Sequence, residues 1–187
     1  MTHIFFWLSS KKMSDDLSKL GFSNNKTKKC NFNFSSIPSN LFPHFLRGFF
    51  DGDGSIFITK YNSVNVHFIG LPNIIEYIHS YLKNNDISSA IYPCYSSYIV
   101  NELRIGNIHE IVKFYDLIYN DAILLLDRKR KKFEMGFDIL RNEIEKLIKD
   151  GRYARPLHYN GAKSLIRKLY LFLRDLNYIN KYRKFTF

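Results

Sequence analysis

Residues 40–58, NLFPHFLRGFFDGDGSIFI, carry the strongest structural signal in the sequence. Its first half carries apolar residues at three- and four-residue spacing, which predicts a helix. Gly48 and Gly52 lie on one side of that helix, where the lack of side chains lets another helix come very close. Asp51 and Asp53 follow where the helix must end, and the alternating residues after them predict a strand. The apolar positions of the helix are Leu41, Phe42, Phe45, Leu46, Phe49 and Phe50.

The two aspartates lie at an unfavourable end of the predicted helix. The C-terminal end of a helix carries partial negative charge, so a carboxylate there is destabilising unless a cation compensates it. A divalent metal ion is the simplest such cation. A calcium-binding loop that starts at Asp51 is excluded, because such a loop needs a glycine at its sixth position and an acid at its twelfth. Those positions hold Ile56 and Asn62.

The composition is that of a folded and strongly basic chain. The chain has 187 residues, of which 45% are hydrophobic, and its formal net charge is +11. A compact domain this basic usually binds a polyanion, and nucleic acid is the default partner. An anionic membrane is the weaker option, since no apolar stretch approaches the length of a membrane span.

The cysteines and the amino-acid composition indicate the cellular compartment of the protein. Cys30 and Cys94 lack the spacing of a zinc site, so we expect reduced thiols in an intracellular compartment. The chain is rich in Asn, Ile, Lys, Tyr and Phe, which AT-rich codons encode. This indicates an organelle (mitochondrion or chloroplast), or a phage or bacterial cytoplasm.

Hairpins alternate with helices after the opening stretch. Period-two alternation predicts two hairpins, and helical spacing predicts two further helices. The order helix, hairpin, helix, hairpin, helix predicts an α+β fold, in which helices back one face of a four-stranded antiparallel sheet. The predicted strands are residues 55–61, 64–69, 90–95 and 98–105, and the predicted helices are residues 71–85 and 107–126.

The two ends of the chain carry additional elements. A small helix is predicted at residues 14–20, with Ser14 as its cap and Gly21 as its stop. A short strand precedes it at residues 1–8. A basic cluster at residues 127–133 closes the last helix of the central fold, and helices at 137–148 and 162–176 follow. The predicted domains are an N-terminal arm, 1–39, a central domain, 40–136, and a C-terminal helical extension, 137–187.

The segment LRGFFDGDG, residues 46–54, resembles the nine-residue motif that names the LAGLIDADG homing endonucleases. It matches at the leucine, the first glycine, both acids and the last two glycines. Arg47 is the clear departure, because the motif carries a small alanine there. Arg47 must point away from the tightest helix contact, or that contact is looser. The resemblance covers residues 8–133 and implies the family's αββαββα repeat, with a saddle-shaped sheet.

The resemblance implies a sequence-specific, metal-dependent and intron-encoded DNA endonuclease, which makes a double-strand break at a long target site. Asp53 is implied as the catalytic ligand of Mg²⁺, whereas Asp51 stabilises the turn by hydrogen bonding. One such acid is too little to cut two strands, so we expect a homodimer in which two motif helices pack together. Its interface would contain Gly48, Gly52, Phe45 and Leu41.

The resemblance also implies a catalytic lysine near the active-site water, on the segment after the last helix of the repeat. Lys129 is the best match, and Lys131 is the second choice. The alternative for this basic cluster is contact with the phosphates of the nucleic acid.

One face of the predicted sheet is expected to bind double-stranded DNA. Isoleucine and valine at alternate positions suit the core, so the side chains between them face outward. Two-stranded ribbons fit the major groove, where polar side chains read base edges. The predicted DNA-binding residues are Ser55, Phe57, Thr59, Tyr61, Asn65, His67, Glu102, Arg104, Arg128 and Lys131.

Two other functions stay open at this point. A maturase, which binds its own intron RNA and helps it splice, would use the same basic charge and aromatic residues. An inactive half of a two-repeat endonuclease is the third option, since residues 8–38 resemble the connection between two such repeats. The alternative for that segment is an N-terminal arm of this protein's own.

Overall fold

A computed structural model describes most of the central part of the chain. Contacts between residues divide the chain into two units, Met1–Ser39 and Asn40–Phe187, and each is described by itself. The predicted strand at 1–8 and the predicted helix at 162–176 lie outside the described residues. Those residues are 9–19, 21, 33–94 and 100–149.

In the first unit, helix α1 (Lys11–Lys19) begins earlier than the sequence predicts. Ser10 caps it, because the Oγ of Ser10 accepts a hydrogen bond from the backbone N–H of Met13 at 3.2 Å. The prediction of Ser14 as the cap is therefore wrong, since Ser14 lies inside the helix. Gly21 is confirmed as the stop: it lies just beyond the helix with a φ of 91°, a conformation that favours glycine.

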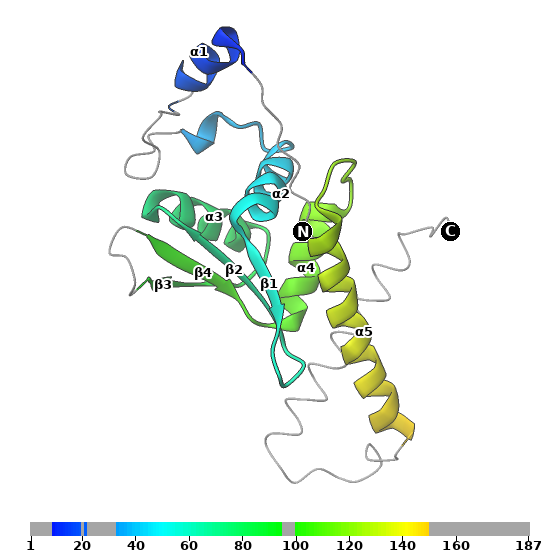
Figure 1. The fold of residues 1–187 in the computed structure, drawn as a ribbon. Helices are drawn as coiled ribbons and strands as arrows, with labels where there is room; N and C mark the ends of the chain where they lie inside the picture. Colours follow the sequence, from blue (N-terminus) through cyan, green and yellow to red (C-terminus); the bar gives the residue numbers. More distant parts are fainter. Residues whose placement is uncertain (1–8, 20, 22–32, 95–99, 150–187) are drawn as a thin grey trace. The chain divides into compact units, whose positions relative to one another are not determined.

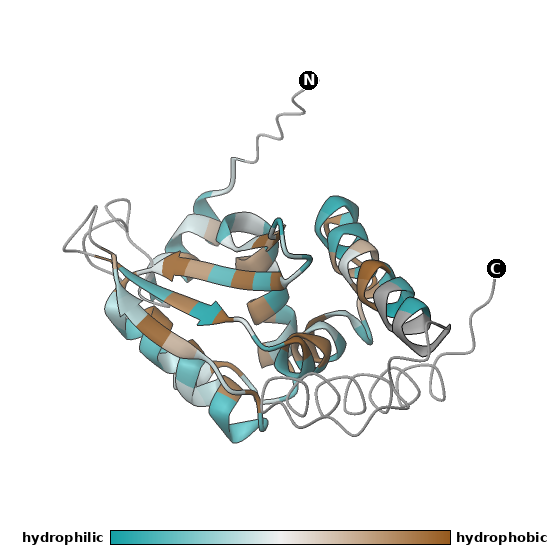
Figure 2. Ribbon diagram, turned by 90° about the horizontal axis from the view of Figure 1, so that it is seen from below, coloured by the Kyte–Doolittle hydropathy of each residue, from teal (hydrophilic) through white to brown (hydrophobic). Residues whose placement is uncertain are grey.

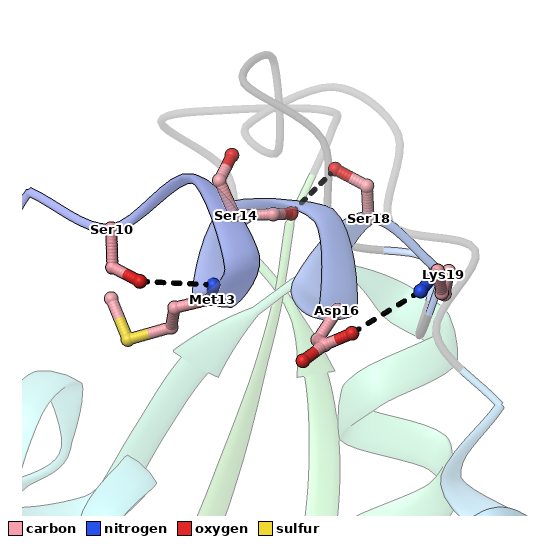
Figure 3. A network of polar contacts seen from close by, with 6 residues as sticks. All are labelled: Ser10, Met13, Ser14, Asp16, Ser18 and Lys19. Carbon is pink, nitrogen blue, oxygen red and sulfur yellow. Dashed lines mark hydrogen bonds and ion pairs between the residues drawn. The ribbon is translucent and has the colours of Figure 1, made fainter.

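Side chains along α1 make local polar contacts. The Oγ of Ser18 donates to the carbonyl of Ser14 at 2.9 Å, and the Nζ of Lys19 donates to Asp16 at 3.3 Å (Figure 3). Every residue of the helix is exposed, and an exposed ion pair contributes only about 0.2–1 kcal/mol. The other element described in this unit is a short 3₁₀ turn, η1 (Phe34–Ser36).

The second unit has the α+β fold that the sequence predicts. Its elements follow the αββαββα order that the resemblance implies, with one helix added at the end. None of the helices in the described part of the chain is long and apolar enough to cross a membrane. The elements are α2 (Phe42–Asp53), β1 (Ser55–Ile58), β2 (Val64–Gly70), α3 (Pro72–Asn84), β3 (Ala90–Pro93), β4 (Asn101–Ile105), α4 (Ile108–Tyr119) and α5 (Asp127–Lys149).

The four strands form one antiparallel sheet in the order β1-β2-β4-β3 (Figure 1). Hydrophobic and hydrophilic residues alternate along the strands (Figure 2). Val66 of β2 pairs with Ile56 of β1 and with Ile105 of β4, and all three side chains are buried. Because side chains alternate across a strand, this register places the apolar side chains on one face and the polar side chains on the other.

Helices α2 to α5 all contact the sheet, and phenylalanines from three of them meet on its apolar face. The ring of Phe50 lies 5.4 Å from the rings of Phe68 and Phe114, and 5.7 Å from the ring of Phe133. All four side chains are completely buried. Such ring pairs contribute about 0.5–1.5 kcal/mol each beyond the burial of their area. Phe50 therefore anchors the C-terminal half of α2 in the core.

Helix α5 packs tightly against the sheet at Gly136. A Cβ atom on Gly136 would lie only 2.5 Å from the Cγ2 of Val64. The domain boundary predicted after residue 136 falls inside α5, which continues without a break to Lys149. Phe137 is buried on this helix, with its ring 5.5 Å from the ring of Tyr115. The C-terminal extension therefore begins as part of the core.

The predicted end of the first strand is wrong. Strand β1 ends at Ile58, because Thr59 begins the hairpin turn. The Oγ1 of Thr59 accepts hydrogen bonds from the backbone N–H groups of Tyr61 at 3.3 Å and of Ser63 at 3.2 Å. Asn62 completes the turn with a φ of 59°, a left-handed conformation that asparagine tolerates better than most residues.

The predicted end of the last central helix is also wrong. Helix α4 ends at Tyr119, and the basic cluster at 127–133 begins α5 rather than closing α4. The connection between them runs from residue 120 to residue 126. Its last backbone N–H, that of Leu126, donates to the side chain of Asp51 at 2.8 Å. This long-range contact holds the connection at the point where α5 begins.

We expect Gly136→Ala to destabilise the fold. The added Cβ would overlap the Val64 side chain, and overpacking costs about 1–3 kcal/mol, more than the helix propensity of alanine returns, about 1 kcal/mol. Urea denaturation followed by circular dichroism measures the change. Met135→Ala, at an exposed neighbour in the same helix, is the control and should change the free energy of unfolding by less than about 0.5 kcal/mol. A Gly136→Ala protein as stable as that control would contradict the packing described.

Candidate functional site

The C-terminal end of α2 is shaped by Gly54. The backbone N–H of Gly54 donates to the carbonyl of Phe50 at 2.9 Å. A Cβ atom on Gly54 would lie 2.3 Å from the Phe50 ring and 2.7 Å from that carbonyl oxygen, so a larger residue would push the turn open. The chain passes directly from this turn into β1. Asp53, the last residue of α2, is left exposed beside the turn.

Asp51 is hydrogen-bonded to other parts of the chain. Its Oδ1 accepts a hydrogen bond from the Tyr119 hydroxyl at 2.9 Å, and its Oδ2 accepts one from the backbone N–H of Leu126 at 2.8 Å. The expected hydrogen-bonding role is present, but its partners lie on α4 and on the connection to α5, not in Asp51's own turn. Burial, followed by the bond to Asp51, raises the pKa of Tyr119. The Tyr119 hydroxyl therefore keeps its proton and remains a hydrogen-bond donor to Asp51.

Lys129 lies under the same end of α2. Its side chain is 5% exposed, and its Nζ donates hydrogen bonds to the carbonyl oxygens of Phe50 and Gly54. The ammonium group lies 4.9 Å from the centre of the Phe50 ring. It therefore gives the Phe50 carbonyl a second donor besides Gly54, bonds the Gly54 carbonyl just beyond the helix, and places positive charge at the negative end of the helix dipole.

Charges of both signs act on the ammonium group of Lys129. Burial, and next the charge of Arg128, lower the pKa of Lys129, while the carboxylates of Asp51 and Asp53 oppose that shift. The capping role was not predicted from the sequence, because Lys129 lies 79 residues from Phe50 along the chain. The catalytic role of Lys129 stays a prediction, as does that of Lys131, which is exposed.

Asp53 presents a carboxylate to solvent at the end of α2. Among the described residues, no group of three or more His, Cys, Asp or Glu side chains could hold a metal ion. A single exposed carboxylate nevertheless suits Mg²⁺, which keeps several waters and binds through one or two carboxylates together with phosphate oxygens. One chain therefore provides part of such a site.

The exposed face of α2 is open along its glycines. Gly48 and Gly52 are exposed, and a Cβ atom on either would meet nothing within 4 Å. Leu41, just before this helix, is 47% exposed, and Phe45 is half-buried, with its ring 5.4 Å from the buried ring of Phe42. These residues leave room for another helix to approach closely.

Arg47 points away from the glycines and toward α4. Its Nη1 donates to the carbonyl of Ile118 at 3.0 Å, near the C-terminal end of α4. The motif carries a small alanine where this chain has Arg47. The larger side chain is accommodated against α4, inside the unit. Arg47 and Asp51 are spaced four residues apart, so one side of α2 binds to α4 while the glycine side stays exposed.

The polar face of the sheet carries most of the predicted DNA-binding residues. Ser55 and Phe57 lie on β1, opposite His67 and Asn65 of β2, in register. Thr59 and Tyr61 are not on this strand but in the hairpin turn beyond it, where Tyr61 is 79% exposed. The sequence prediction missed Tyr92, which is 44% exposed on β3 and pairs with Glu102, although the alternation in that strand could have identified it.

Basic residues at the start of α5 add positive charge near the end of α2. Arg128 and Lys131 are both exposed. They flank Lys129, which is bonded to the end of α2. Arg128 therefore places positive charge beside Lys129, whereas Lys131, two residues further on, lies on another side of α5.

No family model matches the chain, but several solved structures resemble it. One is the LAGLIDADG meganuclease I-AabMI bound to uncleaved DNA, at 27% identity and a TM-score of 0.39 over 61% of this chain and 39% of that one. Another is the archaeal intron-encoded homing endonuclease I-Vdi141I complexed with DNA, at 17% identity and a TM-score of 0.40 over 74% of this chain and 86% of that one. A third is the homing endonuclease I-TnaI, at 17% identity and a TM-score of 0.42 over 70% of this chain and 97% of that one.

The first of these proteins is a LAGLIDADG meganuclease, and the other two are homing endonucleases. The chain spans 39% of the length of the I-AabMI meganuclease. The described residues of this chain themselves have the αββαββα order.

We expect Lys129→Met to destabilise the protein, because two carbonyl groups at the end of α2 would lose a charged donor. Hydrogen bonds to charged groups contribute about 1.5–3 kcal/mol. Urea denaturation measures the loss. Lys132→Met, at an exposed position of the same helix, is the matched control and should stay within about 0.5 kcal/mol of the parent. If both variants unfold at the same urea concentration, Lys129 does not cap α2.

Proposed function

We propose that this protein is a LAGLIDADG-type DNA endonuclease that cuts both strands of a long target site as a metal-dependent homodimer. The observation that carries the proposal is the difference between the two aspartates at the end of α2. Asp51 is bonded within the chain, whereas Asp53, two residues later, is exposed at the end of a helix whose glycine face is open.

The open glycine face supports a second copy of this chain as the partner. If two α2 helices packed through Gly48 and Gly52, their C-terminal ends would bring two Asp53 carboxylates together. Each protomer would then provide the carboxylate for one DNA strand, which accounts for a double-strand break with one motif per chain. A two-fold interface of this kind uses the same surface on both subunits.

The residues around Asp53 suit a divalent cation. When bound, Mg²⁺ would activate a water and offset the negative charge that develops at the phosphate. Asp53 would hold it. Asp51 and Lys129 would keep the end of α2, and with it the Asp53 carboxylate, in a fixed position. Arg128 and Lys131 would bind phosphates beside the scissile bond.

The polar face of the sheet supports duplex binding. Side chains of β1, β2, β3 and β4 stand on that face in register, and a two-stranded ribbon such as the β1–β2 hairpin fits the major groove. The net charge of +11 supports an electrostatic contribution, so affinity should fall as the salt concentration rises. The target sequence would be read by the side chains of this face.

Exposed aromatic side chains support a second candidate function, that of an intron RNA maturase. Tyr61 is 79% exposed, Tyr92 is 44% exposed and Phe57 is 37% exposed. Unpaired RNA bases stack on such rings. A splicing assay with the gene's own intron separates this function from DNA cleavage. An inactive half of a longer enzyme would show neither activity.

Asp53→Asn should abolish cleavage without weakening the fold. The variant loses the metal ligand, and loss of several kcal/mol of charge stabilisation slows cleavage by about 100-fold or more. Its stability should change by less than about 0.5 kcal/mol because Asp53 is exposed. The assay is Mg²⁺-dependent cleavage of duplex DNA that joins the sequences flanking the gene.

Asp51→Asn is the matched control, since it makes the same chemical change two residues away. It should lower the free energy of unfolding by about 1–3 kcal/mol, because its partners on α4 and the connection lose a charged acceptor. An Asp53→Asn protein that cuts as fast as the parent would remove the proposed metal ligand.

A further inference from the structure

Three side chains form a bonded cluster on the polar face of the sheet. His67 lies on β2, and Glu102 and Arg104 lie on β4. The register pairs His67 directly with Arg104, and Glu102 stands on the same face because it is two residues from Arg104. This cluster lies apart from Asp53 and Lys129 along the sequence and is not used in the proposed chemistry.

Glu102 is the centre of the cluster. Its Oε2 accepts a hydrogen bond from the Nη2 of Arg104 at 2.6 Å, and its Oε1 contacts the Nδ1 of His67. The side chain is only 15% exposed. The bond from Arg104 is the main cause that lowers the pKa of Glu102, so the carboxylate is ionised at neutral pH. Both of its oxygens are engaged by neighbours, which argues against the direct DNA contact predicted for it.

The carboxylate selects the tautomer of His67. An ionised carboxylate accepts hydrogen bonds only, so the Nδ1 of His67 must carry the proton. Burial, which outweighs the opposing charge of Glu102, lowers the pKa of His67, so the ring is neutral at neutral pH. Its Nε2 is then a hydrogen-bond acceptor. The ring of Phe57 packs against it in an edge-to-face arrangement, with centroids 4.7 Å apart.

The same carboxylate orients Arg104 as a donor. The side chain of Arg104 is 47% exposed, and its guanidinium carbon lies 4.7 Å from the centre of the Tyr92 ring. The bond to Glu102 and the contact with the Tyr92 ring together fix the plane of the guanidinium group. One bond to Glu102 occupies one of the five N–H donors that the group carries. A donor edge therefore stands beside the acceptor on His67.

We infer that Glu102 is a positioning residue that makes this cluster select a G·C base pair in the DNA target. In the major groove, guanine presents two acceptors, N7 and O6, and cytosine presents the N4 amino donor. Arg104 binds the two acceptors of guanine, and the Nε2 of His67 accepts from the amino group of cytosine. An A·T pair places an adenine amino donor against the donors of Arg104. The inference rests on the proposed DNA-binding function.

Selection from a library of random duplexes, with the full-length chain at fixed salt, tests this inference. The parent protein should enrich targets with a G·C pair at a defined position. Arg104→Ala should remove that preference, about tenfold, and should leave the other enriched positions unchanged. Arg104 is exposed, so this variant is expected to fold.

Glu102→Gln separates positioning from a merely structural or repulsive effect. It should lose most of the G·C preference while its affinity for unselected duplex rises, because a negative charge has left a DNA-binding face. Glu76→Gln makes the same chemical change at an exposed position of α3 and should alter neither property. If Glu102→Gln selects the same base at every position as the parent, the inference is wrong.

The protonation of the His67 ring gives a second readout that does not need DNA. Nitrogen-15 NMR of the parent should show the proton on Nδ1, and Glu102→Gln should shift the population toward Nε2–H. A parent with the proton mainly on Nε2 would overturn the positioning role. If the parent enriches no duplex at all, the proposed function fails and the base preference fails with it. Enrichment that Arg104→Ala leaves unchanged removes the inference alone.

Discussion

The structure depends on how the C-terminal end of α2 is held. That end carries the negative pole of the helix dipole and two aspartates, an arrangement that is unfavourable for an isolated helix. The buried ammonium of Lys129 bonds to the carbonyls of Phe50 and Gly54, and Asp51 accepts hydrogen bonds from α4 and from the connection that follows it. Groups from distant parts of the chain thereby compensate both the negative end of the helix dipole and the carboxylate of Asp51. The remaining carboxylate, on Asp53, is left exposed.

Helix α2 therefore has one side packed within the unit and one side exposed to solvent. One side is held by Phe50 in the aromatic core and by Arg47 on α4, so the helix is fixed within the unit. The other side presents Gly48 and Gly52 to solvent. In the proposed homodimer this open glycine face would contact a second copy, while the opposite side of the helix stays packed in the core.

Much of the fold could be predicted from local patterns. Alternation identified the four strands and their buried face, and helical spacing identified α2, α3 and α4 in their order. The ends of elements were predicted less well, since Thr59 uses its side chain to make a turn and Leu126 is held by a residue 75 positions away. The same limit applies to the site: the motif located Asp53, but nothing local shows that Lys129 caps α2 or that Glu102 joins His67 to Arg104.

The solution mass of the chain, compared with that of Gly48→Leu, tests most directly whether the glycine face of α2 pairs two copies. A leucine at Gly48 meets no atom of its own chain at the Cβ but would prevent close helix approach. Light scattering should give the mass of two 22.2 kDa chains for the parent and of one chain for the variant, with the same circular dichroism spectrum. A parent that is a single chain, both alone and on DNA that it cuts, would contradict the account.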